Sequence, residues 1–119
     1  FVNMSIPENN SVMLNQLAGS RLGIWVAHGE GKFDLSRFKE VNIAGTYSYG
    51  EYPGNPNGSD LNVAALCSKD GRHLAMMPHL ERSIMPWHWP FATKKSTWDH
   101  TPWLEAFVAA RTWVEKLKD

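Results

Sequence analysis

The pair Asp70-Gly71 constrains the fold of this chain more than any other feature of its sequence. It separates two apolar runs, Val63–Cys67 and His73–Met77. Glycine adopts the positive φ of a tight hairpin turn at little cost, and Asp-Gly between apolar runs is a strong hairpin signal. The sequence therefore predicts an antiparallel β-hairpin over residues 63–77.

Three further segments have the pattern of β-strands. Val2–Ile6 alternates apolar and polar side chains, and Val41–Tyr49 is rich in Val, Ile, Thr and Tyr. Arg21–Ala27 is a continuous apolar run, which predicts a strand covered on both faces. This run ends at the glycine-rich segment His28–Gly31. A buried strand that ends in a flexible polar loop is a common place for a functional site.

Two shorter features complete this part of the chain. Ser11 is suited to cap a short helix that runs to Leu17 and that Gly19 ends. Gly50–Asp60 combines proline, asparagine and glycine at a density that excludes regular structure, so we expect a loop there.

One longer helix is predicted near the C-terminal end. Thr101 is suited to the N-cap and Pro102 to the first helical position. Apolar residues then recur at helical spacing along one stripe. The stripe consists of Trp103, Phe107, Ala110, Val114 and Leu117. Each large member would contribute about 1.5–3 kcal/mol if buried, so we expect this stripe to pack against the rest of the protein.

The composition is that of one globular domain or a part of one. The chain has 119 residues, of which 43% are hydrophobic and 20% charged, and this excludes a disordered or fibrous chain. Twelve basic residues balance twelve acidic ones, so no net charge attracts nucleic acid or an anionic membrane surface. The apolar runs fall far short of the roughly 20 residues that span a bilayer. We expect neither nucleic acid nor a membrane as a partner.

The cysteine content and the first residues of the chain give expectations about the cellular location of the protein. Cys67 is the one cysteine and cannot form an internal disulfide, which favours a reducing compartment and a cytoplasmic location. The chain starts at Phe1, with neither an initiator methionine nor the pattern of a signal peptide. These features suggest a truncated or processed chain.

His79 and Glu81 follow an apolar strand and are the strongest candidates for chemistry. Residues two apart in an extended segment point to the same side, so these two side chains can converge. A carboxylate that accepts a hydrogen bond from one imidazole nitrogen fixes the tautomer and leaves the other nitrogen to exchange a proton with a thiol. A His-x-Glu pair also occurs by chance on protein surfaces, so spacing alone does not assign catalysis.

The segment Met76–Arg82 resembles the histidine and glutamate motif of class I glutamine amidotransferases. Within that class, it is most similar to the glutaminase domain of phosphoribosylformylglycinamidine synthases. The other segments that carry this resemblance are Ala27–Phe33, Asn55–Ser59, Asp70–Arg72 and Thr101–Trp103. They occur in the expected order and span most of the chain from Arg21 onward.

Two departures from the family pattern affect what can be carried over. Leu80 stands where the family usually has proline, which supplies rigidity but no reacting group. The family nucleophile is a cysteine between glycines on a tight strand-to-helix turn, and this sequence has no such segment. Cys67 lies in a predicted hairpin strand and reads as a small buried residue. The resemblance thus implies that residues 1–119 form a single partial domain without the upstream nucleophile segment, inactive alone.

The resemblance implies both a fold and an activity. The fold class is α/β, as the C-terminal fragment of a flavodoxin-like amidotransferase domain, with a mostly parallel central sheet, a β-hairpin and a C-terminal helix. In the complete enzyme, glutamine is hydrolysed through a cysteine thioester, and His79 protonates the departing ammonia. The ammonia passes to the synthetase portion, where ATP and magnesium support amidation of formylglycinamide ribonucleotide in purine biosynthesis. No cofactor is expected in this chain itself.

Other features allow alternatives. By resemblance, the loop of His28, Gly29 and Glu30 lines the glutamine pocket, although it could equally be a structural turn that needs its glycines. The Trp87–Trp89 segment would serve a non-catalytic module that binds a small ligand or a protein, or it packs as aromatic residues usually do. No metal site is expected, since no set of ligands has zinc spacing. A partial domain exposes apolar surface, so self-association of the chain is a further expectation.

Overall fold

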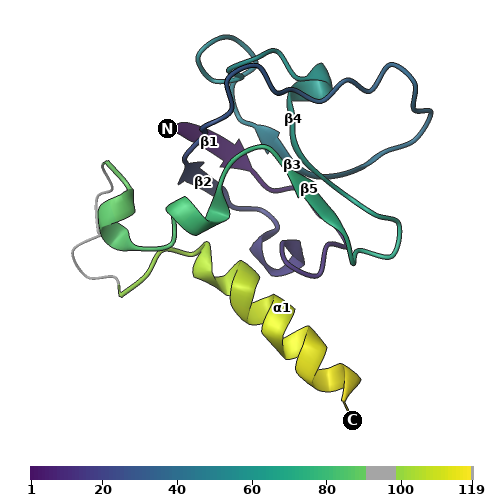
Figure 1. Ribbon diagram of the computed structural model, residues 1–119, viewed down its shortest axis with the longest axis vertical. Coiled ribbons are helices and arrows are strands. Elements are labelled where there is room, and N and C mark those ends of the chain that lie inside the picture. The colour runs from purple at the N-terminus through teal and green to yellow at the C-terminus, as the bar shows by residue number, and fades with distance from the viewer. Residues whose placement is uncertain (91–98, 119) are drawn as a thin grey trace.

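A computed structural model describes residues 1–90 and 99–118 of the chain. These residues form one five-stranded sheet with the strand order β2-β1-β3-β4-β5, followed by a single α-helix (Figure 1). The elements are β1 Val2–Ser5, β2 Arg21–Ile24, β3 Asn42–Tyr47, β4 Val63–Cys67, β5 Leu74–Met76 and α1 Leu104–Leu117. Short 3-10 turns are η1 Asn15–Leu17, η2 Asp60–Asn62, η3 Leu80–Arg82 and η4 Pro86–His88.

The predicted hairpin is confirmed as β4 and β5, with Cys67 opposite Leu74 and Ala65 opposite Met76. Gly71 has a φ of 75°, the left-handed conformation that the turn requires. A Cβ atom there would also lie 2.0 Å from the carbonyl oxygen of Asn10, so the turn packs directly against the N-terminal segment. The local sequence and the packing therefore both require glycine at this position.

The sheet is antiparallel throughout, and the prediction of a mostly parallel sheet is wrong. Every neighbouring pair of strands runs in opposite directions. Parallel neighbours are usually joined by a helix that crosses the face of the sheet. In the described part of the chain, the connections between strands contain only 3-10 turns, and the α-helix follows the last strand. The α/β composition stands, but the strands belong to an antiparallel arrangement.

The apolar run Arg21–Ala27 is not a strand covered on both faces. Its first part, β2, lies at an edge of the sheet and pairs with β1 alone. The exposed Arg21 has its guanidinium carbon 5.7 Å from the ring centroid of Tyr49. Trp25 then leaves the sheet and forms an isolated antiparallel bridge with His79. The first part of the run therefore pairs within the sheet, and Trp25 after it supports the His79 segment.

Helix α1 begins at Leu104, two residues after the predicted first position Pro102, with Trp103 and not Thr101 at the N-cap, and it buries a different face from the predicted stripe. The Thr101 hydroxyl accepts a hydrogen bond from the Trp103 backbone N–H at 3.3 Å, and Trp103 is fully buried. The helix then contacts the body of the protein through the small residues Ala106 and Ala109. The predicted stripe is only partly buried: Trp103 is buried and Ala110 half-buried, but Phe107, Val114 and Leu117 are exposed, at 38%, 48% and 63%. Small side chains permit the closer approach of the helix, so they face inward.

In Figure 1, α1 lies below the sheet and the long loops before β3 and β4 lie above it. The described residues contain no helix with the length and apolar character needed to cross a membrane.

Candidate active site

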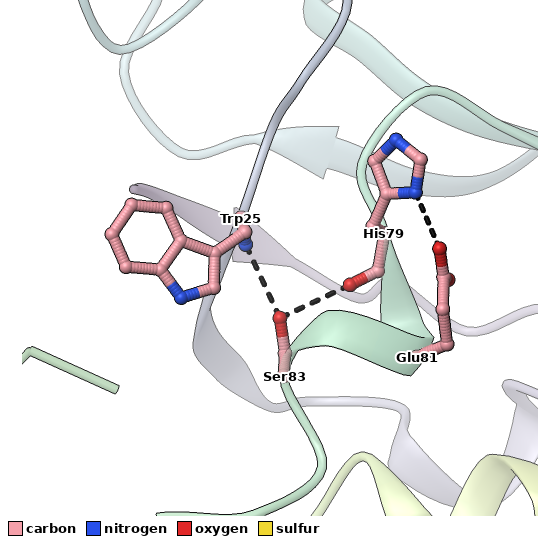
Figure 2. A network of polar contacts seen from close by, with 4 residues as sticks. All are labelled: Trp25, His79, Glu81 and Ser83. Carbon is pink, nitrogen blue, oxygen red and sulfur yellow. Dashed lines mark hydrogen bonds and ion pairs between the residues drawn. The ribbon is translucent and has the colours of Figure 1, made fainter. Parts of the chain in front are cut away.

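His79 and Glu81 converge as the sequence predicts, although through a 3-10 turn and not through an extended segment. The Nδ1 atom of His79 lies 2.5 Å from Oε1 of Glu81, and Figure 2 shows the two side chains facing each other. His79 has extended backbone angles and Glu81 lies in η3, so one change of backbone direction brings the side chains together. The side chains are 33% and 61% exposed, respectively. The pair is therefore accessible from solvent.

This geometry defines the proton positions that the pair can use. The Glu81 carboxylate accepts the hydrogen bond from Nδ1–H, so the neutral ring has its lone pair on Nε2. The hydrogen bond from His79 is the main cause that lowers the pKa of Glu81, with a contribution from a backbone N–H. Glu81 is thus a carboxylate at neutral pH, and Nε2 of His79 can accept a proton from a group placed next to it.

The backbone of His79 is attached to the end of the β2 run. Its N–H donates to the carbonyl oxygen of Trp25 at 2.9 Å. The Ser83 hydroxyl accepts from the Trp25 N–H at 3.2 Å and donates to the His79 carbonyl at 3.1 Å, as Figure 2 shows. Thr101, just before α1, donates its hydroxyl hydrogen to the Ser83 carbonyl at 2.6 Å. Three separate parts of the chain therefore hold the histidine in place.

Sequence patterns did not indicate Trp25, Ser83 or Thr101 as members of this site. Trp25 and Thr101 lie far from His79 along the chain, and Ser83 has no motif of its own. Ser83 is fully buried, and a buried hydroxyl normally has hydrogen-bond partners, so its burial points to a structural role. The sequence alone does not show that Ser83 is buried.

His28 lies in a second polar network close to this pair. The Asn57 side-chain amide donates to His28 Nδ1 at 2.7 Å and to the Gly31 carbonyl at 2.9 Å. The other ring nitrogen, Nε2, lies 3.4 Å from the hydroxyl of Tyr47. Burial is the largest cause that lowers the pKa of His28, and the charge of His79 also lowers it. Both ring nitrogens of His28 therefore have partners within the protein.

The loop that contains His28 packs against the loop before β4. The Phe33 N–H donates to the Ser59 hydroxyl at 3.0 Å, and the Asp60 N–H donates to the Phe33 carbonyl at 3.0 Å. A Cβ atom on Gly31 would meet the side chain of Met77 at 2.3 Å. Segments that carried the family resemblance in the sequence, residues 27–33, 55–59 and 76–82, are thus adjacent in space.

Gly29 and Glu30 occupy the exposed part of this loop. A Cβ atom on Gly29 would meet nothing within 4 Å, and neither Gly29 nor Gly31 has a positive φ. The loop therefore does not depend on glycine for its turn geometry. The close contact at Gly31 is with the terminal methyl of the flexible Met77 side chain, which can move aside.

A pocket of about 290 Å³ lies beside the His79–Glu81 pair. Its walls come from the end of β5, from η3 and from Phe107 of α1. The lining residues are Leu74, Met76, Met77, Pro78, His79, Leu80, Glu81 and Phe107. A mostly apolar wall with two polar groups on one side suits a small polar molecule that is oriented at one end.

Cys67 lies at the other end of the hairpin from His79. It pairs with Leu74, next to the turn, whereas His79 follows β5. Leu74 is the first residue of β5, and His79 follows the end of that strand after a bend at Met77 and Pro78. Burial raises the pKa of the Cys67 thiol, whereas a nucleophilic cysteine requires a lowered value. Cys67 also borders a larger hollow of about 750 Å³ with Lys39 and Lys69, away from the His79 pair.

The tryptophan segment packs largely against the body of the protein. Trp89 is 6% exposed, with its ring centroid 6.3 Å from that of Phe1. The Trp25 indole N–H donates to the His88 carbonyl at 2.5 Å. Trp87 remains 74% exposed. Residues 91–98, which follow this segment after Pro90, lie outside the described residues. Within residues 1–90 and 99–118, no three His, Cys, Asp or Glu side chains are grouped so that they could hold a metal ion.

Comparison with known proteins shows the family to which the chain belongs. The sequence model of the CobB/CobQ-like glutamine amidotransferase domain family matches residues 1–114. The chain is 40% identical over 134 residues to the probable phosphoribosylformylglycinamidine synthase, chloroplastic/mitochondrial, of Arabidopsis thaliana, covering 97% of this chain and 9% of the relative.

Two more relatives are named phosphoribosylformylglycinamidine synthase. The Homo sapiens protein is 38% identical over 122 residues, and the Saccharomyces cerevisiae protein is 40% identical over 121 residues. Each alignment covers 87% of this chain and 9% of the relative, so the chain spans about a tenth of the length of these proteins. The resemblance seen in the sequence is confirmed, and the chain belongs to the CobB/CobQ-like glutamine amidotransferase domain family.

Proposed function

We propose that this chain is part of the glutaminase of a phosphoribosylformylglycinamidine synthase and supplies the general base of that glutaminase. The observation that carries the proposal is the His79–Glu81 pair, a histidine with one ring nitrogen bonded to a carboxylate and the other able to accept a proton. The pair occurs in a chain of an amidotransferase family, beside a small pocket.

The proposed reaction requires a thiol from another part of the full-length protein. Nε2 of His79 takes the proton of that thiol, and the sulfur attacks the side-chain amide carbon of glutamine. The carbon–nitrogen bond breaks as His79 returns the proton to the departing nitrogen, which leaves as ammonia. Water, deprotonated by His79, then attacks the thioester, so glutamate leaves and the thiol is restored. Glu81 stabilises the imidazolium in both halves of the reaction.

The ammonia would serve a synthetase portion of the full-length protein, which amidates formylglycinamide ribonucleotide in purine biosynthesis. ATP and magnesium are proposed to act in that synthetase portion. The length of the relatives supports this division, because the chain covers only 9% of each of the three named above. A cytoplasmic location remains a prediction.

The loop of His28, Gly29 and Glu30 is proposed to border the glutamine site. It is linked to the His79 segment through the contact between Gly31 and Met77. The ring of His28 is held by Asn57 and Tyr47, so its role would be to fix the loop. Glu30 is exposed, and its carboxylate is the group that could meet the ammonium group of the substrate.

The exposed side of α1 supports the proposal that another part of the full-length protein covers this chain. Phe107, Val114 and Leu117 leave an apolar surface on the helix, and Phe107 also borders the pocket beside His79. In isolation, residues 1–119 should therefore self-associate as their concentration rises. Sedimentation of the isolated chain as a monomer at millimolar concentration would contradict this expectation.

Glutamate release from glutamine tests the proposed function. The full-length protein should release glutamate, and residues 1–119 alone, used as a blank, should not, because their one thiol is Cys67. A full-length protein without glutaminase activity would contradict the proposal. Activity of residues 1–119 alone would contradict the assignment of the nucleophile to another segment.

Replacement of Glu81 by glutamine should lower kcat for glutamate release by about 100-fold. The amide can still accept the hydrogen bond from Nδ1 but no longer carries the charge that stabilises the imidazolium. The effect is smaller than for a buried orienting carboxylate, because Glu81 is 61% exposed and partly screened by water. Steady-state kinetics of the full-length variant measures it, with Glu105→Gln on α1 as the control. A Glu81→Gln enzyme as active as this control would exclude an orienting role.

The hydrogen bond between His79 and Glu81 should make the difference in stability between wild type and Glu81→Gln depend on pH. The folded-state pKa of Glu81 is lowered from its ordinary value of 4.5, so the carboxylate stabilises the fold above about pH 4.5. That contribution is lost as the pH falls through the lowered value. Urea unfolding of residues 1–119 should show wild type more stable than Glu81→Gln at pH 5.5, with the difference reduced at pH 2.5. A difference that grows on acidification would contradict this linkage.

A further inference from the structure

We infer that Ser83 is a positioning residue for His79, acting through a hydroxyl inserted between two paired backbone segments. The inference rests on the proposed function, since it concerns the placement of the base in glutamine hydrolysis. Ser83 touches neither the reacting side chains nor the pocket beside them. Its effect on the reaction would pass entirely through the backbone of His79.

The bridge between Trp25 and His79 shows what the hydroxyl does. In an antiparallel pair with direct hydrogen bonds, the two residues exchange both N–H···O=C bonds. Here one bond is direct, from the His79 N–H to the Trp25 carbonyl at 2.9 Å. The reverse bond runs through Ser83, from the Trp25 N–H to the hydroxyl at 3.2 Å and from the hydroxyl to the His79 carbonyl at 3.1 Å. The hydroxyl therefore acts as a spacer within the bridge.

Hydrogen bonds of both the side chain and the backbone hold Ser83 in this position. It is fully buried, and its hydroxyl both donates and accepts, so it has little freedom to turn away. Its backbone carbonyl accepts the hydroxyl hydrogen of Thr101 at 2.6 Å, and the Ser83 N–H donates to Leu80 at 2.9 Å. The position of the spacer is thus set by η3 and by the segment that leads into α1.

Removal of the hydroxyl leaves the Trp25 N–H and the His79 carbonyl without their relay. Backbone groups that lose their partners are costly unless water reaches them, so the two segments would close on each other or admit water. Either change moves the Cα atom of His79 and with it the imidazole. A displacement of about 1 Å at a reacting group can lower the rate by about 100-fold.

The test is Ser83→Ala in the full-length protein, assayed for glutamate release. We expect kcat to fall by about 100-fold while the KM for glutamine stays within about twofold, since Ser83 does not line the pocket. Synthesis driven by added ammonium salts should be unchanged, because it does not need the glutaminase. Ser83→Thr keeps the hydroxyl and should restore kcat substantially.

Ser11→Ala is the matched control. Ser11 is also fully buried, and its hydroxyl accepts from the Met13 and Leu14 N–H groups, neither of which belongs to the site. Its loss should affect stability without lowering kcat per folded molecule. If Ser83→Ala does not fold, Ser83→Cys keeps the shape of the side chain with a poor hydrogen-bond donor and should still lose kcat.

The outcomes separate this inference from the proposed function. Wild-type protein that releases no glutamate contradicts the proposed function itself. If wild type is active and either Ser83→Ala or Ser83→Cys has the same kcat as Ser11→Ala, the positioning role alone is overturned. A change confined to KM would overturn it as well, since it would place Ser83 in substrate binding.

Discussion

Replacement of His79 by glutamine in the full-length protein should lower glutamate release by roughly 10⁴-fold. Glutamine has a similar length and can hydrogen-bond to Glu81, but it cannot accept a proton from a thiol or return one to ammonia. Both halves of the proposed reaction would therefore lose their proton carrier. The initial rate of glutamate formation at saturating glutamine measures the loss.

His73→Gln provides a control on the same hairpin. His73 lies just before β5, is exposed, and has no part in the site, so its replacement should leave the rate unchanged. Ammonium-dependent synthesis by His79→Gln should also match wild type, which would show that the rest of the protein is folded. Equal losses in both reactions would mean that His79 supports the fold instead of the chemistry.

Truncation of Trp103 to alanine should destabilise residues 1–119 by about 3–5 kcal/mol. Trp103 is fully buried, and its indole N–H donates to the carbonyl oxygen of Gly23 at 2.8 Å, which joins the start of α1 to β2. The variant would lose this hydrogen bond and leave a large cavity beneath the helix. Urea-induced unfolding followed by circular dichroism measures the change.

Trp87→Ala removes the same side chain from an exposed position. Since Trp87 is 74% exposed, its loss should change the stability by less than about 0.5 kcal/mol. The stability of Trp103→Phe should fall between those of Trp103→Ala and Trp87→Ala, because an aromatic ring is retained and the N–H donor is lost. A Trp103→Ala chain as stable as Trp87→Ala would contradict the packing of α1 described above.

Local features of the chain could be predicted from the sequence. The Asp70-Gly71 turn and the alternation in Val2–Ile6 depend on neighbouring residues, and both appear as expected. The contact between His79 and Glu81 also depends on local geometry, since the residues are two apart. Patterns within a few residues therefore predicted the hairpin and the contact between His79 and Glu81.

Long-range features were not accessible in this way. The direction of strand pairing depends on how connections cross the sheet, and no short segment encodes it. The exposed stripe on α1 differs from the prediction because helical spacing shows which residues share a face, but not which face meets the body. Ser83 and Trp25 are 58 residues apart, so no local pattern could reveal the relay between them.

The role of His79 can be tested by chemical rescue. His79→Ala in the full-length protein should release almost no glutamate, and added imidazole should restore activity, because the side chain is 33% exposed beside an open pocket. The restored rate should rise with the concentration of neutral imidazole. Glutamate release by His79→Ala at the wild-type rate without imidazole would contradict the assignment of His79 as the general base.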